Sequence, residues 1–342
     1  MIWHPLTWAF WVAAATGTAL YAIATGCAVD VALNWRPDHA DHGQLRCERH
    51  AQMASLLGRW ALGILAAAAL IGLVGISRVW HRIIPGAMCG TGVLQAMGIY
   101  GSQALIFWGL LLALFWGWSV GDRLDQSRPQ SCLAETGARL LIAVCPILVL
   151  ALFHTWQAVM QIDGAPPVSC CAAVYDRILN NDSGLATQSR AISIALWSSL
   201  SGIAILPLVV MMAVRYPHGP TGGIAALLAI AWTGTSTVAV KHTWSAYYYQ
   251  VLSHPCPWCL FLPDYNGAGF LIFGCLAIIL LESIALWTAG RIRSHAPLVD
   301  PADQRMRQAV WRIVVALVGF TLLTAGPAIL WRLRTGVWMD GT

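Results

Sequence analysis

Long apolar stretches recur along the chain, separated by shorter segments that hold most of the charged residues. Each stretch is long enough to cross a bilayer, because a helix needs about 20 residues to do so. The stretches lack the alternation of apolar and polar positions that is typical of barrel strands, which favours helices. We therefore predict an all-α polytopic membrane protein with about eight transmembrane helices. The predicted spans are 5–28, 55–76, 92–118, 138–160, 191–214, 222–248, 265–290 and 308–331.

The composition agrees with this fold class. Of the 342 residues, 58% are hydrophobic and 10% are charged, whereas soluble domains carry roughly 25% charged residues. The net charge of +5 comes almost entirely from arginine, with Lys241 as the one lysine. In a membrane protein such an excess is first a topology signal. No basic stretch is interleaved with aromatic residues, so we expect membrane lipid as a partner and no nucleic acid.

The arginines predict the orientation of the chain. With eight spans, thirteen arginines fall on one side of the membrane and six on the other, and the richer side is expected to be cytoplasmic. Both termini, the 161–190 loop and the "PCPWC" turn at 255–259 then face outward. The first span has no basic residue before it, so we expect a retained span and not a cleaved signal. The family resemblance described below implies a bacterial inner (plasma) membrane, with the active cysteines facing the periplasm or exterior.

Several of the ten cysteines are expected to have no chemical role. Cys145 and Cys275 lie inside predicted spans, where cysteine usually packs as a small apolar residue. Cys27, Cys47 and Cys132 fall on the predicted cytoplasmic side, where thiols stay reduced. We therefore look for chemistry among the cysteines of the outer side.

Four cysteines fall together on the outer side, which is an oxidising compartment. Cys256 and Cys259 form a Cys-x-x-Cys motif, and Cys170 and Cys171 are adjacent in the 161–190 loop. A Cys-x-x-Cys favours a close disulfide whose thiol pKa values can be tuned. Zinc is an alternative, since His254 could help complete a four-ligand site. One such motif is weak evidence for a metal, so we predict redox chemistry and no metal, with inert packing of the cysteines as a further alternative.

Two stretches resemble the vitamin K epoxide reductase family. "CCAAVYDRILNNDSGLATQSRAISIALWSSLSGIAIL" at 170–206 is similar to its cysteine loop and following span, and "YYYQVLSHPCPWCLFLPDYNGAGFLIFG" at 247–274 is similar to its Cys-x-x-Cys and next span. The resemblance covers roughly 138–331 and predicts a family-like membrane domain there. Residues 1–137 would form a three-span region of unassigned role, and 332–342 a short outward-facing tail.

The resemblance implies a membrane thiol–quinone oxidoreductase that supports disulfide formation. A four-helix bundle, with one further helix in this part, would hold ubiquinone or menaquinone beside the Cys-x-x-Cys. A thioredoxin-like dithiol protein, supplied in trans, would donate electrons. By position Cys171 would exchange with Cys256, and Cys259 would lie next to the quinone. The family spaces its loop cysteines several residues apart, so Cys170 either takes the second loop position or the relay is interrupted.

Three ionisable residues lie within predicted spans, namely His154, Lys241 and His242. Such groups are costly in a bilayer and usually face a partner or a site. We predict that they bind the quinone headgroup or carry protons, although Lys241 could reach the interface instead. A rival hypothesis makes His154 and His242 axial ligands of a haem in an electron-transfer subunit. A further alternative is a non-catalytic bundle that anchors a partner.

Two features of the N-terminal third have simpler expected roles. The glycine-rich segment 86–101 is typical of close helix packing, although Cys89 within it would add a thiol near the outer surface. The loop at 30–50 carries possible metal ligands whose spacing matches no strong template, so we expect a solvated loop. These possible ligands are His39, His42, Cys47 and His50.

Overall fold

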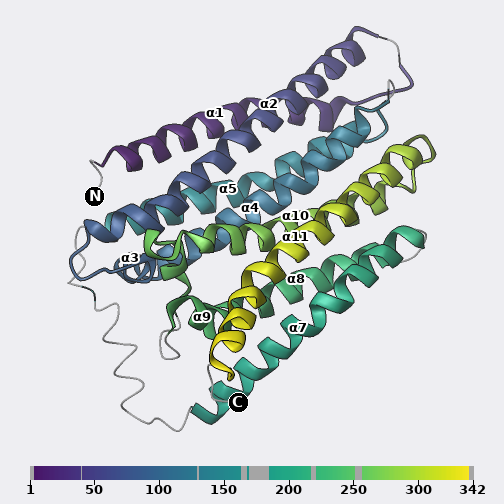
Figure 1. The fold of residues 1–342 in the computed structure, drawn as a ribbon. Coiled ribbons are helices and arrows are strands. Elements are labelled where there is room, and N and C mark those ends of the chain that lie inside the picture. Colours follow the sequence, from purple (N-terminus) through teal and green to yellow (C-terminus); the bar gives the residue numbers. More distant parts are fainter. Residues whose placement is uncertain are drawn as a thin grey trace. The chain divides into compact units, whose positions relative to one another are not determined.

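A computed structural model of the chain describes residues 4–39, 41–128, 131–162, 168, 185–216, 221–250 and 256–338. Throughout these ranges the regular elements are helices (Figure 1). Eight helical segments of the described chain are long and apolar enough to cross a membrane, which confirms the predicted all-α polytopic fold. The long helices are α1 (Pro5–Asn34), α2 (His42–Val74), α4 (Gly98–Asp125), α5 (Ala134–Ile162), α7 (Leu185–Arg215), α8 (Thr221–Ala239), α10 (Ala268–Ile292) and α11 (Val299–Thr335).

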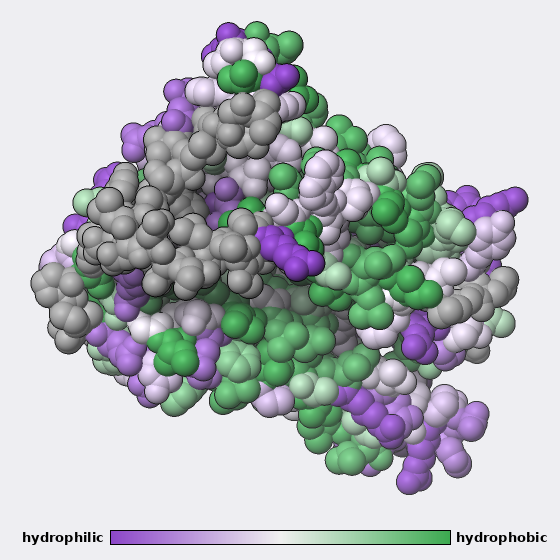
Figure 2. All heavy atoms as spheres, turned by 90° about the horizontal axis from the view of Figure 1, so that it is seen from below, coloured by the Kyte–Doolittle hydropathy of each residue, from purple (hydrophilic) through white to green (hydrophobic). Residues whose placement is uncertain are grey.

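Short helical elements extend or connect the long ones. A π-turn, η1 (Gly75–Val79), and a 3-10 turn, η2 (Trp80–Arg82), continue α2, and α8 runs through the π-turn η3 (Val240–Trp244) into α9. Hydrophobic side chains gather over a wide area of the face drawn in Figure 2, as lipid contact requires. The chain is thus an integral membrane protein. The remaining short elements are α3 (Gly90–Ala96), α9 (Ser245–Tyr249), η4 (Pro257–Phe261), η5 (Pro263–Tyr265) and η6 (Ala296–Leu298).

The chain forms two compact units that alternate along the sequence. Unit 1 comprises Met1–Ile76, Leu94–Pro166 and Thr288–Gln304, and unit 2 comprises Ser77–Val93, Pro167–Trp287 and Arg305–Thr342. This division differs from the predicted boundary after residue 137 in three places, the third being Thr288–Gln304, which belongs to unit 1.

The first difference is α5, which the sequence places in the family-like domain and which packs in unit 1 against α1 and α4. The hydroxyl of Tyr21 in α1 donates to the carbonyl of Leu141 in α5, which ties the two helices together inside the hydrophobic interior. The second difference is the segment 77–93, which belongs to unit 2 although the sequence placed it in the N-terminal region.

Unit 1 is held by small residues on α1 and α2 that let helices approach closely. A Cβ on Gly17 would lie 2.8 Å from Leu65 Cγ, and one on Gly58 would lie 2.5 Å from the Trp118 ring. Van der Waals packing of this kind holds helices together in lipid, where apolar burial alone gives little driving force. α1, α2, α4 and α5 lie side by side within the unit (Figure 1).

Unit 2 combines close packing with polar contacts between its helices. The indole N–H of Trp232 in α8 donates to the Ser199 carbonyl in α7 at 3.0 Å, and a Cβ on Gly202 would clash with the same ring. Glu282 of α10 pairs with Arg305 and Arg312 of α11, at 2.7 and 2.9 Å. These contacts join α7 to α8 and α10 to α11.

Candidate active site: a centre of three thiols

The Cys-x-x-Cys folds as a single 3-10 turn. Cys256 caps η4 with an extended backbone, and Pro257 occupies the first helical position, where its fixed φ suits a helix start. The N–H of Cys259 donates to the Cys256 carbonyl at 3.3 Å. Residues three apart eclipse one another in a 3-10 helix, so both sulfurs point to the same side. Both cysteines are buried, as a redox pair shielded from solvent would be.

An arginine from the end of α2 fixes the turn that follows. Arg78 Nε donates to the Phe261 carbonyl at 2.8 Å, and its guanidinium lies 4.9 Å from the centre of the Phe270 ring. Gly267 has a φ of +62°, and a Cβ there would lie 2.2 Å from Arg78 Nη2. Glycine suits the reversal into α10 at this position, because other residues adopt this backbone conformation only with strain.

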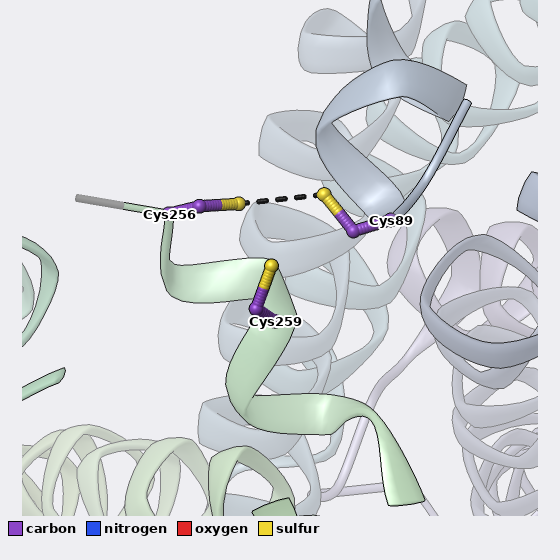
Figure 3. A group of neighbouring side chains, drawn as sticks. All are labelled: Cys89, Cys256 and Cys259. Carbon is purple, nitrogen blue, oxygen red and sulfur yellow. Dashed lines mark hydrogen bonds between the residues drawn. The ribbon is translucent and has the colours of Figure 1, made fainter. Parts of the chain in front are cut away.

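A third thiol, Cys89, completes the site, and the sequence did not single it out as a partner of the motif. Its Sγ lies 3.4 Å from Cys256 Sγ, and the sulfurs of Cys89, Cys256 and Cys259 all lie within 4.8 Å of one another. Figure 3 shows the three side chains converging, two from η4 and one from the turn before α3. Cys89 is 1% exposed, so the centre is closed to bulk water.

The glycine-rich segment interlocks with the motif through three consecutive residues. Cys89 meets Cys256, Thr91 Oγ1 lies 3.1 Å from the same sulfur, and Gly90 lies against the indole of Trp258. A Cβ on Gly90 would be 2.5 Å from Trp258 Cε3, closer than real Cβ contacts. The predicted packing role of this segment is thus confirmed at Gly90. The clue in the sequence is that a thiol, a glycine and a hydroxyl stand side by side in "CGT".

The neighbours of Cys256 favour its thiolate. Hydrogen bonds from the thiols of Cys259 and Cys89, and then from the Thr91 hydroxyl, hold the pKa of Cys256 well below its usual value. They outweigh burial, which by itself disfavours the charged form. A thiolate is the nucleophile of thiol–disulfide exchange and the better leaving group. The surroundings of Cys256 therefore favour the form of its sulfur that takes part in exchange.

Aromatic side chains enclose the other flank of the motif. Phe261 stacks on Phe273 with centroids 5.4 Å apart and lies 5.5 Å from Trp258. Tyr265 meets Tyr249 edge to face at 4.7 Å. Burial, followed by the nearby Cys259 and Asp264, raises the pKa of Tyr265, so its phenol stays protonated.

Other predicted site residues lie elsewhere or outside the described residues. Cys170 and Cys171, like His254, belong to the segments that the structure does not describe. Val168 is described, and its N–H donates to the Pro85 carbonyl at 3.2 Å.

The ionisable residues of the spans are divided between the two units. His154 belongs to unit 1, where its ring stacks on Phe107 at 4.9 Å with 12° between the planes. Lys241 and His242 belong to unit 2, in the π-turn η3, where Lys241 is exposed and His242 half-buried. The exposed Lys241 fits the alternative in which its side chain reaches toward an interface.

The possible metal ligands of 30–50 lie mostly in a helix, so the expected loop at 42–50 is wrong. Asp41 caps α2 by accepting from the Gln44 N–H at 2.8 Å, which starts the helix before the membrane span. His50 Nδ1 lies 2.7 Å from Asp30 Oδ2, and Cys47 Sγ lies 4.0 Å from the same oxygen. Within the described residues, the only cluster with metal-ligand geometry is the centre of three thiols.

Comparisons with known proteins leave the family open. No protein-family model, curated protein or solved structure matches the chain. The resemblance to the vitamin K epoxide reductase family therefore remains a prediction from two sequence stretches, and the geometry of the three thiols has to carry the functional argument.

Proposed function

We propose that this protein is a membrane thiol–quinone oxidoreductase that passes electrons from an external dithiol partner to a quinone. The observation that carries the proposal is the position of Cys256, buried between two other sulfurs with its thiolate favoured. A cysteine that serves only for packing needs no such donors. A relay does need them, because each sulfur must be within reach of the next.

The reaction balances with one disulfide in the resting enzyme. A partner dithiol attacks the oxidised centre, forms a mixed disulfide and leaves as its own disulfide, so that two cysteine thiols are generated. Cys256 and Cys259 then give two electrons and two protons to the quinone, which becomes quinol, and their S–S bond forms again. The partner is a thioredoxin-like dithiol protein in trans, and the acceptor is ubiquinone or menaquinone.

The aromatic flank supports a quinone as the acceptor. A quinone headgroup is a flat ring that packs well against aromatic faces, and Trp258 and Phe261 belong to the same turn η4 as Cys259, with ring centres 5.5 Å apart. Tyr265, kept protonated by its surroundings, is suited to donate a hydrogen bond to a quinone oxygen. Lys241 and His242 are further candidates for the headgroup or for proton transfer, and so is His154.

The proposed location is the bacterial plasma membrane with the thiols facing outward. The support for this orientation is the distribution of arginines, thirteen on the side opposite the motif. In an oxidising compartment, the disulfides that the oxidised partner forms in its own substrates would persist.

The test is quinone reduction by purified protein. With dithiothreitol as donor, the wild type should reduce a short-chain ubiquinone or menaquinone analogue. Replacing either motif cysteine, Cys256→Ser or Cys259→Ser, should lower the rate roughly 10³-fold or more, since both sulfurs act as a unit. The control Cys275→Ser changes a cysteine of α10 that stands outside the centre and should keep the activity.

Two outcomes would overturn the proposal. Folded wild-type protein that reduces neither quinone would leave a non-catalytic anchor as the better reading. A strong Soret absorption band that disappears in His154→Ala would instead support the haem-binding electron-transfer subunit.

A further inference from the structure

We infer that Cys89 is a third redox-active cysteine, which exchanges with Cys256 and so switches the disulfide of the centre between two pairings. This inference rests on the proposed thiol chemistry and adds a residue that the resemblance does not supply. In one pairing Cys256 is bonded to Cys259, and in the other to Cys89.

The distances place Cys89 within reach of this exchange. Its Sγ is 3.4 Å from Cys256 Sγ, and a disulfide requires about 2.05 Å, so a small movement of the two side chains closes the bond. In Figure 3 the Cys89 side chain points from its own segment straight toward the motif. Both residues are at least nine-tenths buried.

The backbone around Cys89 is fixed on both sides, so the approach is built into the fold. Ahead of it, Gly86 has a φ of +79° and lies against the Val168 carbonyl, and Pro85 accepts from the Val168 N–H. After it, the missing side chain of Gly90 lets the Trp258 ring rest on the segment. A segment that served only for helix packing would not need a thiol 3.4 Å from Cys256 Sγ.

Cys256 is the sulfur that both partners share. It accepts hydrogen bonds from Cys259 and from Cys89, yet it can form only one S–S bond at a time. The arrangement therefore allows two disulfides that exclude each other, which is the property of a relay and not of a static crosslink.

The exchange step conserves atoms and electrons. The Cys89 thiol loses its proton, and its thiolate attacks Cys256 in the Cys256–Cys259 disulfide. The Cys89–Cys256 bond forms as the Cys256–Cys259 bond breaks, and the electron pair leaves on Cys259, which takes up the proton. No net oxidation occurs in this step. The disulfide now joins Cys89 to Cys256, and Cys259 is a thiol. The partner dithiol then reduces the new disulfide by attacking Cys89 or Cys256.

Disulfide mapping tests the pairing without relying on quinone. Purified protein is reduced, oxidised with diamide, alkylated with N-ethylmaleimide and digested for mass spectrometry. In Cys259→Ser, Cys256 cannot be released by its neighbour, so a Cys89–Cys256 link should accumulate. In Cys89→Ser the Cys256–Cys259 link should remain, and the control Cys275→Ser should show the wild-type pattern. Near-identical thermal melting curves would show that the variants are folded.

The outcomes separate the inference from the proposed function. If Cys256 in folded Cys259→Ser is linked to Cys171, or to any cysteine other than Cys89, the inference fails while the relay survives. If Cys256 stays a thiol in every folded variant, both fail. Stoichiometric zinc or copper found by mass spectrometry in the wild type as isolated, and lost in Cys89→Ser, would also overturn the inference, because the three sulfurs would then be ligands.

Discussion

Two places in the molecule bury a cysteine where two segments of helix meet, and they surround its sulfur in opposite ways. In unit 1, Cys47 is buried near the start of α2, and its sulfur faces the carboxylate of Asp30, which also binds His50. In unit 2, Cys256 is equally well buried, but the groups that face its sulfur are the thiol of Cys89 and other hydrogen-bond donors.

The contrast shows that burial does not decide what a cysteine can do. A carboxylate next to Cys47 repels a second negative charge, so that sulfur is suited to remain a thiol. Around Cys256, thiols and the Thr91 hydroxyl donate to the sulfur and stabilise its thiolate. The cysteine sulfur is thus expected to be inert at Cys47 and activated at Cys256.

Among the variants that test this contrast, we expect the largest effect from Gly90→Ala, which should lower the yield of the Cys89–Cys256 disulfide. The new methyl group would lie 2.5 Å from the Trp258 ring, so the segment has to move away from η4. Overpacking of this kind costs about 1–3 kcal/mol, and the shift should separate Cys89 from Cys256. The measurement is the yield of the Cys89–Cys256 link in the double variant Gly90→Ala/Cys259→Ser, together with the melting temperature.

Gly274→Ala is the matched control for this variant. Gly274 lies within α10 with no atom within 4 Å of a Cβ built there, so alanine should leave the fold unchanged or stabilise it by up to about 1 kcal/mol. An undiminished Cys89–Cys256 yield in the Gly90→Ala background would mean that the close contact with Trp258 does not position Cys89.

The second prediction concerns the pH dependence of the thiolate. Because the pKa of Cys256 is lowered, its thiolate is already formed below neutral pH, whereas an ordinary thiol gains reactivity as pH rises toward about 8.5. Alkylation of Cys256 by iodoacetamide, followed by mass spectrometry, should thus vary little between about pH 6 and 8. Thr91→Val removes one donor and should shift the acidic fall-off of alkylation upward by about one pH unit, measured below pH 6, since such a bond is worth roughly 1.5 kcal/mol or more.

Thr91→Ser keeps the hydroxyl and is expected to retain the flat pH profile. A profile that rises tenfold per pH unit in the wild type would show that Cys256 is an ordinary thiol, and the contrast with Cys47 would disappear.

The sequence predicted most of the helices. Of the candidate site, it singled out Cys256 and Cys259 but did not identify Cys89 as their neighbour. Apolar length was enough to find the spans, but it missed how far helices extend beyond the bilayer. The span predicted at 55–76 belongs to a helix that begins at His42, because Asp41 caps it among polar residues. α11 likewise begins at Val299, nine residues before the predicted span.

Cys256 and Cys259 could be found because their spacing is local and carries chemical meaning on its own. Cys89 lies 167 residues from Cys256 along the chain. The contact between the two sulfurs depends on how Gly90 packs against Trp258. No periodic pattern in a single sequence indicates such a contact. The packing of α5 in unit 1 was not visible in the sequence for a similar reason. Helix partners in lipid are chosen by small-residue contacts and a few hydrogen bonds, such as Tyr21 to Leu141, and not by amphipathic patterns.

The smallest effect on stability and activity is expected from Asp30→Asn, which changes the carboxylate next to Cys47. Asp30 pairs with His50 and Arg46, at 2.7 and 3.5 Å, where the side chains of all three are at least 22% exposed. Exposed pairs of this kind contribute about 0–1 kcal/mol, so the melting temperature should change little. Quinone reduction should stay at the wild-type rate, because this cluster belongs to unit 1 and carries no thiol of the proposed centre. The assay is the one used for the cysteine variants, with melting curves beside it. A loss of activity in folded Asp30→Asn as large as that in Cys256→Ser would place the chemistry around Asp30 and Cys47, and would reverse the roles that we assign to the two cysteines.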